Sequence, residues 1–256
     1  MRTVVENENQ PITNDETGKM TRTIHPEQRT AATIAAVSSL CSMIIVVLAN
    51  YQLLNPLIVR GSAAETARNI VAHETQFRIA LTGFLIYGLN SIVLAAALYI
   101  VFRTINRGLA ITALLFRLVF AMLWLLTTLN LLGALRLAGN TRYLQVFEPD
   151  RLQALARVYL SATFDDYYVG LPFFGLAVML ASYLWLKSGY IPRWLAMFGL
   201  ISSGWCVVCA FAYLIIPNFG KAVNPYIFDT AMALFEMILG VWLLVTGLQQ
   251  KVEIRK

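Results

Sequence analysis

The chain has 256 residues, of which 58% are hydrophobic and 13% are charged, and its mean hydropathy is +0.65. Soluble domains carry about 25% charged residues, so this composition excludes a soluble globule, a coiled coil and a disordered chain. It indicates a polytopic membrane protein. The net charge of +6 does not indicate a nucleic-acid partner, because Lys and Arg are scattered among apolar segments rather than clustered.

Six segments are apolar over the length of about 20 residues that a helix needs to cross a bilayer. We place them at roughly 31–54, 79–102, 109–135, 167–186, 193–216 and 227–249. They do not alternate apolar and polar residues, which excludes a β-barrel. The predicted fold is therefore an all-α, six-helix transmembrane bundle over residues 29–249. Residues 1–28 are expected to be a disordered tail and residues 250–256 a short basic tail.

The Lys and Arg residues near the ends of the spans predict the orientation. The side of both termini carries 11 of them and the other side carries 8. The first group sits in two tails and two very short loops, whereas the second sits mostly in long loops beside Asp and Glu. We therefore expect a multi-pass protein of the bacterial inner membrane with both termini in the cytoplasm.

Two outer loops carry helical periodicity. Residues 61–77 place several apolar residues on one helical face, and residues 150–164 repeat apolar residues at i, i+3, i+4 and i+7. Asp150 after Pro149 is a plausible helix start. We expect two short amphipathic helices lying at the outer membrane interface.

Charged residues inside spans are costly and rare, so they are the first functional candidates. Arg117 lies in the third span, and Glu236 lies in the sixth at a depth that a long Arg side chain can reach. We predict an Arg117–Glu236 pair inside the bundle. It is either a ligand or proton site or a structural clamp between two spans. Asn90 is a further polar residue at depth, for which interhelical hydrogen bonding is a sufficient explanation.

A second polar group is predicted at the outer end, as a vestibule formed by Glu74, Arg78, Asp165 and Asp166. Adjacent residues on a helix point about 100° apart, so at most one of the two Asp residues faces the bundle. We expect one of them to meet Arg78. A metal site that would add His73 is disfavoured, because catalytic zinc sites have three protein ligands at recognisable spacings. We expect no metal and no cofactor.

Two further patterns have mainly structural interpretations. Cys206 and Cys209 form a C-x-x-C in the middle of the fifth span, where no helix terminus or cation is evident to activate a thiolate. We interpret them as packing residues rather than a redox pair. Tyr167, Tyr190 and other aromatic residues near span ends are expected to form an aromatic belt.

Short motifs in a shared order resemble the bacterial membrane family catalogued as domain of unknown function 4386. They include Asn55 to Val59, Phe116 to Leu118, Gly170 to Gly175, Ser188 to Arg193 and Trp242 to Leu244. The resemblance covers about residues 29–249. Phe120 stands where the family has an acidic residue, and Asp165–Asp166 stand where it has a His. The resemblance implies the helical fold and the membrane location, and it implies no activity.

Three functions remain open at the level of sequence. The first is a protein that binds or moves a small molecule or lipid in a polar cavity containing Arg117 and Glu236. The second is an accessory or regulatory membrane subunit without catalytic activity, in which that pair is structural. The third is an intramembrane enzyme with Glu236 or Asp166 as a general base, although no spacing matches a known catalytic constellation and no catalytic residue is assigned. Membrane lipids are the expected surroundings.

Overall fold

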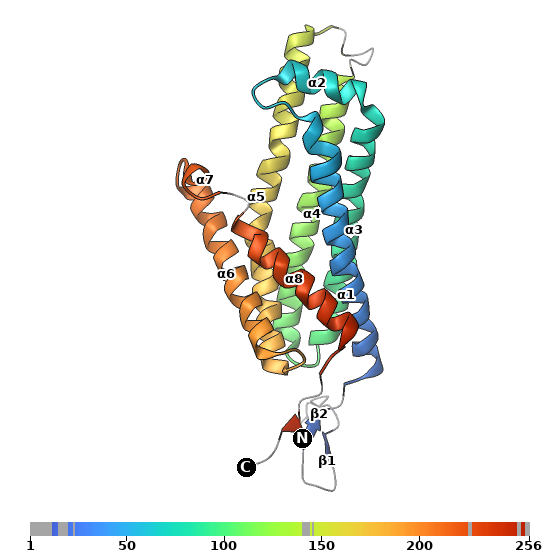
Figure 1. The fold of residues 1–256 in the computed structure, drawn as a ribbon, viewed down its shortest axis with the longest axis vertical. Helices are drawn as coiled ribbons and strands as arrows, with labels where there is room; N and C mark the ends of the chain where they lie inside the picture. The colour runs from blue at the N-terminus through green and yellow to red at the C-terminus, as the bar shows by residue number, and fades with distance from the viewer. Residues whose placement is uncertain are drawn as a thin grey trace, which may run out of the picture.

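The computed structural model describes residues 12–14, 20–22, 24–139, 144, 146–224, 227–249 and 252–253. Six helices in it are long and apolar enough to cross a membrane, so the chain is a multi-pass membrane protein. They are α1 with its continuation η1 and η2, then α3, α4, α5, α6 and α8 (Figure 1). The predicted all-α fold is confirmed.

The elements follow one another in a simple order. Their bounds are β1 (Ile12–Asn14), β2 (Met20–Arg22), α1 (Pro26–Val47), the π-helical η1 (Leu48–Leu54), the 3-10 turn η2 (Asn55–Leu57), α2 (Ala63–Ala72), α3 (Glu74–Phe102), α4 (Arg107–Ala138), α5 (Pro149–Ser188), α6 (Arg193–Ile215), α7 (Phe219–Ala222), α8 (Ile227–Val245) and β3 (Val252–Glu253). The strands pair as an antiparallel sheet in the order β1-β2-β3.

The six spanning helices form a closed ring. Each packs against its neighbours in chain order, and α8 closes the ring by packing between α6 and α1. Short connections after α3 and α5 make successive helices antiparallel. Helix α4 therefore lies across the ring from α8, which crosses the bundle obliquely (Figure 1). We call the end where α1 begins and α8 ends the proximal end, and the end that carries α2 the distal end.

Local sequence signals explain where the helices begin and end. The Asn106 side chain accepts a hydrogen bond from the Leu109 N–H at 3.0 Å and caps α4. Gly189 ends α5 in the left-handed conformation at φ 67°, and Pro192 precedes α6. At the start of α2, Ser62 accepts from the Glu65 N–H at 3.2 Å.

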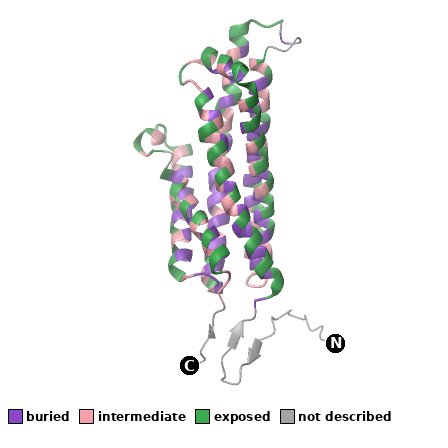
Figure 2. Ribbon diagram, turned by 45° about the vertical axis from the view of Figure 1, so that its right-hand side comes forward, coloured by how far each residue is buried: buried purple, intermediate pink, exposed green. Residues whose placement is uncertain are grey.

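Buried and exposed residues both occur along each spanning helix, as expected where one face packs inside the ring and another faces outward (Figure 2). Many large apolar side chains on the outer faces of the spanning helices are exposed, among them Ile44, Leu89, Met122, Ile201 and Val208. Exposed apolar side chains all around a bundle are what a helix surface facing lipid requires. Inside, leucine, alanine and aromatic side chains form most of the core.

Of the two short amphipathic helices predicted in the outer loops, the structure contains the first and not the second. Helix α2 lies within the predicted segment 61–77 and buries Ala67 and Ile70. The predicted separate helix at 150–164 is wrong, because this segment is the beginning of the 40-residue helix α5. Leu152, Ala156 and Leu160 are buried along it where α5 packs on α2 and α4. No Gly or Pro separates this segment from the fourth span before Gly170, so the helix runs through.

The terminal segments are described only in part. The expected disordered tail, residues 1–28, contains β1 and β2 and the beginning of α1, and most of its other residues lie outside the described part. The expected basic tail, 250–256, contributes Val252 and Glu253 to β3 and otherwise lies outside the described part as well.

A buried glutamine joins three elements at the proximal end. Gln28 Nε2 donates to the Val101 carbonyl at 3.0 Å, to Thr104 Oγ1 at 2.9 Å and to the Tyr190 hydroxyl at 3.4 Å. The Gln249 N–H donates to the Tyr190 carbonyl at 2.8 Å. Tyr190 is therefore buried in the fold, and its predicted place in an aromatic belt is wrong.

The contact between α6, α5 and α8 leads to a stability prediction. A Cβ on Gly199 would lie 2.5 Å from both Phe235 Cζ and Ser182 Oγ, and both neighbours are buried. We expect Gly199→Ala to lower the free energy of unfolding by about 1–3 kcal/mol through overpacking. Gly204→Ala is the control on the same helix, because no described atom lies within 4 Å of its Cβ position. Thermal unfolding in detergent measures both, and equal melting temperatures would contradict this packing.

Candidate functional site

The central feature of the site is an ion pair across the ring. Arg117 Nη2 lies 2.8 Å from Glu236 Oε1, and the two side chains are 6% and 19% exposed. Arg117 is ten residues into α4, and Glu236 is nine residues from either end of α8. The predicted pair is confirmed, and it joins two helices that face each other across the core.

The rest of the guanidinium has aromatic and unpaired surroundings. The Arg117 Cζ lies 5.2 Å from the centre of the Phe174 ring, within the range of a cation–π contact. Phe120 stacks on Phe174 with ring centres 4.5 Å apart. Arg117 Nε is buried and has no hydrogen-bond partner among the residues that the structure describes. An arginine in this state has unused donor capacity for a planar acceptor such as a carboxylate.

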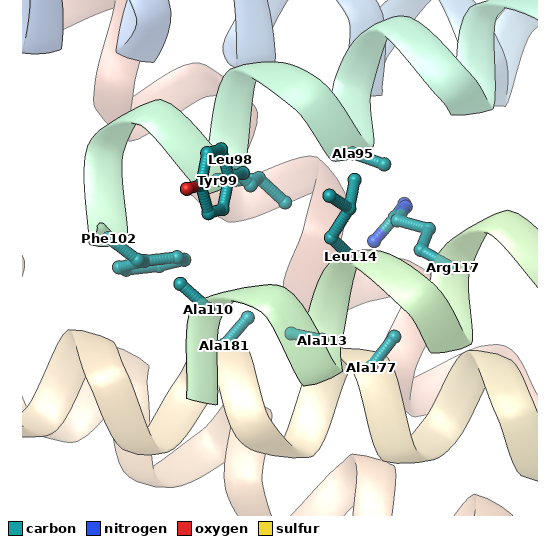
Figure 3. A pocket seen from close by; sticks show the side chains of 10 residues that line it. All are labelled: Ala95, Leu98, Tyr99, Phe102, Ala110, Ala113, Leu114, Arg117, Ala177 and Ala181. Atoms are coloured by element: carbon teal, nitrogen blue, oxygen red, sulfur yellow. The ribbon is translucent and has the colours of Figure 1, made fainter. Parts of the chain in front are cut away.

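A small cavity adjoins Arg117 between α3, α4 and α5 (Figure 3). Its volume is about 10 Å³, the space of a single water molecule. Half of its lining consists of alanine methyl groups, from Ala95, Ala110, Ala113, Ala177 and Ala181. Leu98, Tyr99, Phe102 and Leu114 complete the wall beside the arginine. The cation therefore stands at one end of a narrow apolar space.

A second, partly buried carboxyl, that of Asp229, lies nearer the distal end of the core. The Tyr167 hydroxyl of α5 donates to Asp229 Oδ2 of α8 at 2.5 Å. Asp229 stands at the start of a predicted span, so it was not among the candidates for a charged residue at depth. Its spacing was the available signal, because residues seven apart, such as Asp229 and Glu236, lie on the same face of a helix. Tyr167 faces the core, so its predicted place in an aromatic belt is wrong.

Aromatic side chains fill the ring around these two carboxyl groups. Tyr87 and Trp124 have ring centres 4.5 Å apart, and Tyr168 stacks on Tyr213 at 4.1 Å. We call the connected set the aromatic cluster; its members are Phe84, Tyr87, Phe120, Trp124, Tyr167, Tyr168, Phe174, Tyr213, Phe219 and Phe228. The rings of the cluster thus lie around the polar groups on several sides.

The two adjacent aspartates face opposite environments, as predicted. Asp166 is buried and accepts hydrogen bonds from Asn130 Nδ2 at 2.7 Å and Thr127 Oγ1 at 3.2 Å, both on α4. Asp165 is exposed on the outer side of α5. Asp166 therefore links α5 to α4.

The predicted outer vestibule is not assembled. Arg78 pairs with Glu74, one helical turn away, at 2.7 Å, and both side chains are largely exposed. Asp166 bonds to α4 and Asp165 faces outward, so neither meets Arg78. The contact of Arg78 within its own turn replaces the predicted contact between spans, because an i,i+4 partner is always within reach.

Asn90 has a structural role at its position. Its Nδ2 donates to the Ser38 carbonyl and to Ser42 Oγ at 2.7 Å each, and both acceptors belong to α1. Asn90 thus ties α3 to α1. Nearby, Ser39 Oγ donates to the backbone carbonyl of Glu236 at 3.2 Å and ties α1 to α8.

The cysteine pair and His73 are not part of the Arg117–Glu236 pair. Cys206 and Cys209 are buried and their thiols are free. The His73 ring is exposed and contacts the Asn69 carbonyl. Within the described ranges, no group of three or more His, Cys, Asp or Glu side chains could hold a metal ion.

Removal of one charge from the central pair gives a prediction with a matched control. We expect Arg117→Gln to lower the free energy of unfolding by about 3–5 kcal/mol, because it leaves Glu236 as an uncompensated charge in the core. Arg103→Gln breaks an exposed pair with Glu27 and should cost no more than about 1 kcal/mol. Thermal unfolding in detergent compares them. Equal losses would mean that the central pair contributes no more than a surface contact.

Comparison with known proteins gives one match. The profile of the family described as domain of unknown function DUF4386 matches residues 34–247. No curated protein and no solved structure matches the chain. The matched region begins in α1 and ends just after α8, so it includes the whole ring and both members of the central pair. The chain therefore belongs to the DUF4386 family.

Proposed function

We propose that this protein binds a small amphipathic anion inside its ring of helices and carries it across the membrane. The observation that supports this most directly is the state of Arg117. It is a buried cation whose carboxylate partner comes from the opposite helix and whose Nε has no partner. Glu236 occupies the position that the carboxylate of a ligand would take, so a ligand would replace it.

The surroundings of Arg117 narrow the class of ligand. A planar guanidinium forms paired hydrogen bonds with carboxylate or phosphate oxygens. The alanine-lined cavity and the Phe174 ring offer only apolar contact beside it. A compact carboxylate with an apolar ring or short tail meets both conditions.

The ring has to open to admit such a ligand, because the cavity holds about one water molecule. Two features of the chain support movement. Pro172 lies inside α5, where its missing N–H removes one helical hydrogen bond. The π-helical η1 continues α1, and π-helical segments often occur at functional sites.

A second candidate is an accessory membrane subunit without a ligand of its own. The close packing of the aromatic cluster supports it, because such packing holds a fixed core. In that role the central pair is a clamp between α4 and α8.

Binding of a probe anion separates the two candidates. We expect saturable binding of benzoate, one per protein, to the wild type in lipid nanodiscs by isothermal titration calorimetry. Arg117→Lys should weaken it at least about tenfold, because an ammonium lacks the planar fork of a guanidinium. Arg78→Lys is the control, since Arg78 is exposed and pairs only within its own helix. Absence of saturable binding, or equal binding by Arg117→Lys, would favour the accessory role.

The proposal includes an orientation in the bacterial inner membrane, with the proximal end in the cytoplasm. The Lys and Arg count over the whole chain, 11 against 8, supports it. Several distal arginines are paired with acidic neighbours, Arg68 with Glu65, Arg78 with Glu74 and Arg151 with Glu148.

Fusions test this orientation. Green fluorescent protein attached after Lys256 should fluoresce in bacterial cells, because it folds in the cytoplasm. Alkaline phosphatase inserted after Gly139, at the distal end of α4, should be active, because it needs the periplasm for its disulfides. Inactive phosphatase together with a dark fluorescent fusion would reverse the orientation.

A further inference from the structure

The central site has no net charge, and an anionic ligand would change that. Arg117 and Glu236 compensate each other. A monovalent anion on Arg117 would leave one uncompensated negative charge in the ring if Glu236 stayed ionised, which is costly in a medium of low dielectric constant. A proton on Glu236 removes this charge. Building on the proposed function, we infer that the site takes up one proton on Glu236 with each monovalent anion, and that this proton comes from Asp229 through Tyr87.

The geometry of Arg117 allows this exchange. A neutral Glu236 no longer neutralises the guanidinium, whose Nη2 is then available to the anion together with the already unpartnered Nε. The protonated carboxyl keeps an O–H group that can donate to the same anion. The site thus holds one cation, one anion and one neutral acid, and its net charge is again zero.

The residues between the distal surface and Glu236 form the route. Asp229 and Glu236 are seven residues apart on α8, so they share a face and lie about 10 Å apart along the axis. The Tyr87 ring of α3 contacts Trp124, whose ring contacts Tyr167 at Asp229. On its other side it contacts Phe120, which stacks on the Phe174 ring beside Arg117. Tyr167 holds the Asp229 carboxylate through its short hydrogen bond. Tyr87 is therefore the group placed to connect the two carboxyl groups.

Of the two carboxyls of α8, Asp229 is the one nearer to the distal end of that helix. It stands in the first turn of α8 and is only partly buried. An open groove of about 410 Å³ lies at the distal end of α6, lined by residues 213–221. Two rings from this groove, Tyr213 and Phe219, pack on Phe228 with centres 5.9 Å and 5.7 Å away. Water in the groove therefore lies beside the residue that precedes Asp229.

The titratable groups around both carboxyls come from several helices. Asp229 is faced by Tyr167 of α5, Tyr87 of α3 and Cys206 of α6. Glu236 is faced by Arg117 of α4 and Tyr87 of α3, and α1 contributes Ser39, which bonds its backbone carbonyl. Arg117 is the one cation among these neighbours, so the charge of Glu236 is set against Arg117 alone.

The proton moves from water to Glu236 in two steps, and the number of protons is conserved in each. Distal water gives one proton to the Asp229 carboxylate. Asp229 then passes a proton to the Tyr87 oxygen, which releases its own hydrogen to Glu236. At the end Asp229 and Tyr87 have their starting forms, Glu236 is neutral, and one proton has left the water.

Calorimetry in buffers of different ionisation enthalpy counts the protons bound with benzoate. We expect about one proton per benzoate in the wild type, and a dissociation constant that rises about tenfold per pH unit where Glu236 is ionised in the free protein. Glu236→Gln, which carries the neutral form permanently, should bind benzoate with no proton uptake and no such pH dependence.

The outcomes separate this inference from the function on which it rests. Benzoate binding by the wild type without proton uptake, or unchanged uptake in Glu236→Gln, would overturn the inference and leave the anion site in place. No benzoate binding to either protein would overturn the proposed function, and the inference with it. The pH dependence of the wild type decides the question even if Glu236→Gln does not fold.

The entry route has its own test. Benzoate is mixed rapidly with the protein, and a pH dye follows proton uptake. We expect Asp229→Asn to slow the uptake at least about tenfold without changing the final amount. Asp165→Asn is the control, because Asp165 is exposed on the outer side of α5. Tyr167→Phe, which keeps the Asp229 carboxyl, should slow it too. Unchanged rates in both core variants would place the entry elsewhere.

Discussion

Arg117 and Glu236 can stay inside this ring because each lies within hydrogen-bond distance of the other. A lone charge in a lipid-embedded core is costly, so helices α4 and α8 must keep the depth and rotation that hold the two groups at 2.8 Å. This requirement constrains where α8 can lie, and α8 crosses the bundle obliquely (Figure 1). Gly240 permits that position, because its bare backbone lies against Leu40 of α1.

The polar side chains of the core differ in how many of their hydrogen-bonding atoms have a partner. Gln28, Asn90 and Asp166 each make two or more hydrogen bonds to a neighbouring helix or loop, so they fix adjacent elements and leave little capacity for a ligand. Arg117 differs from them because it is a buried cation whose Nε has no partner among the described residues. Unpartnered buried polar atoms also occur on four neutral residues and on the partly buried Arg157, namely Ser91, Ser182, Trp185, Trp242 and Arg157 Nη1. Incomplete satisfaction of a costly buried group is the physical reason to place the function at Arg117.

The same packing that protects the charges also limits access to them. Aromatic rings lie on the distal side of the pair, and an alanine-lined space of about 10 Å³ lies on its proximal side. The ring is thus closed at its centre. A ligand enters only if helices separate, and a neutral Glu236 lowers the electrostatic cost of separating α4 from α8. The protonation of Glu236 therefore affects both the net charge of the site and the cost of opening the ring.

The sequence by itself determined the membrane class, the six spans and the opposite charges inside them. Apolar runs of sufficient length have no other stable environment, and two opposite charges buried in one bundle have no other stable arrangement. The sequence could not determine contacts that depend on the rotation of a helix, nor whether two helical segments form one continuous helix. Residues 150–164 carry an amphipathic pattern that suits a surface helix equally well, and only contact with α2 and α4 makes them part of α5.

Apart from the central pair, the tertiary structure decided which polar residues meet. Arg78 had partners of equal chemistry in Glu74 and the two aspartates, and the local i,i+4 contact prevailed because it needs no alignment of helices. Tyr167 has the sequence signature of a membrane-interface residue, yet the closure of the ring by α8 brings Asp229 to its hydroxyl. Such contacts depend on the relative rotation of two helices, which the packing of all six sets together.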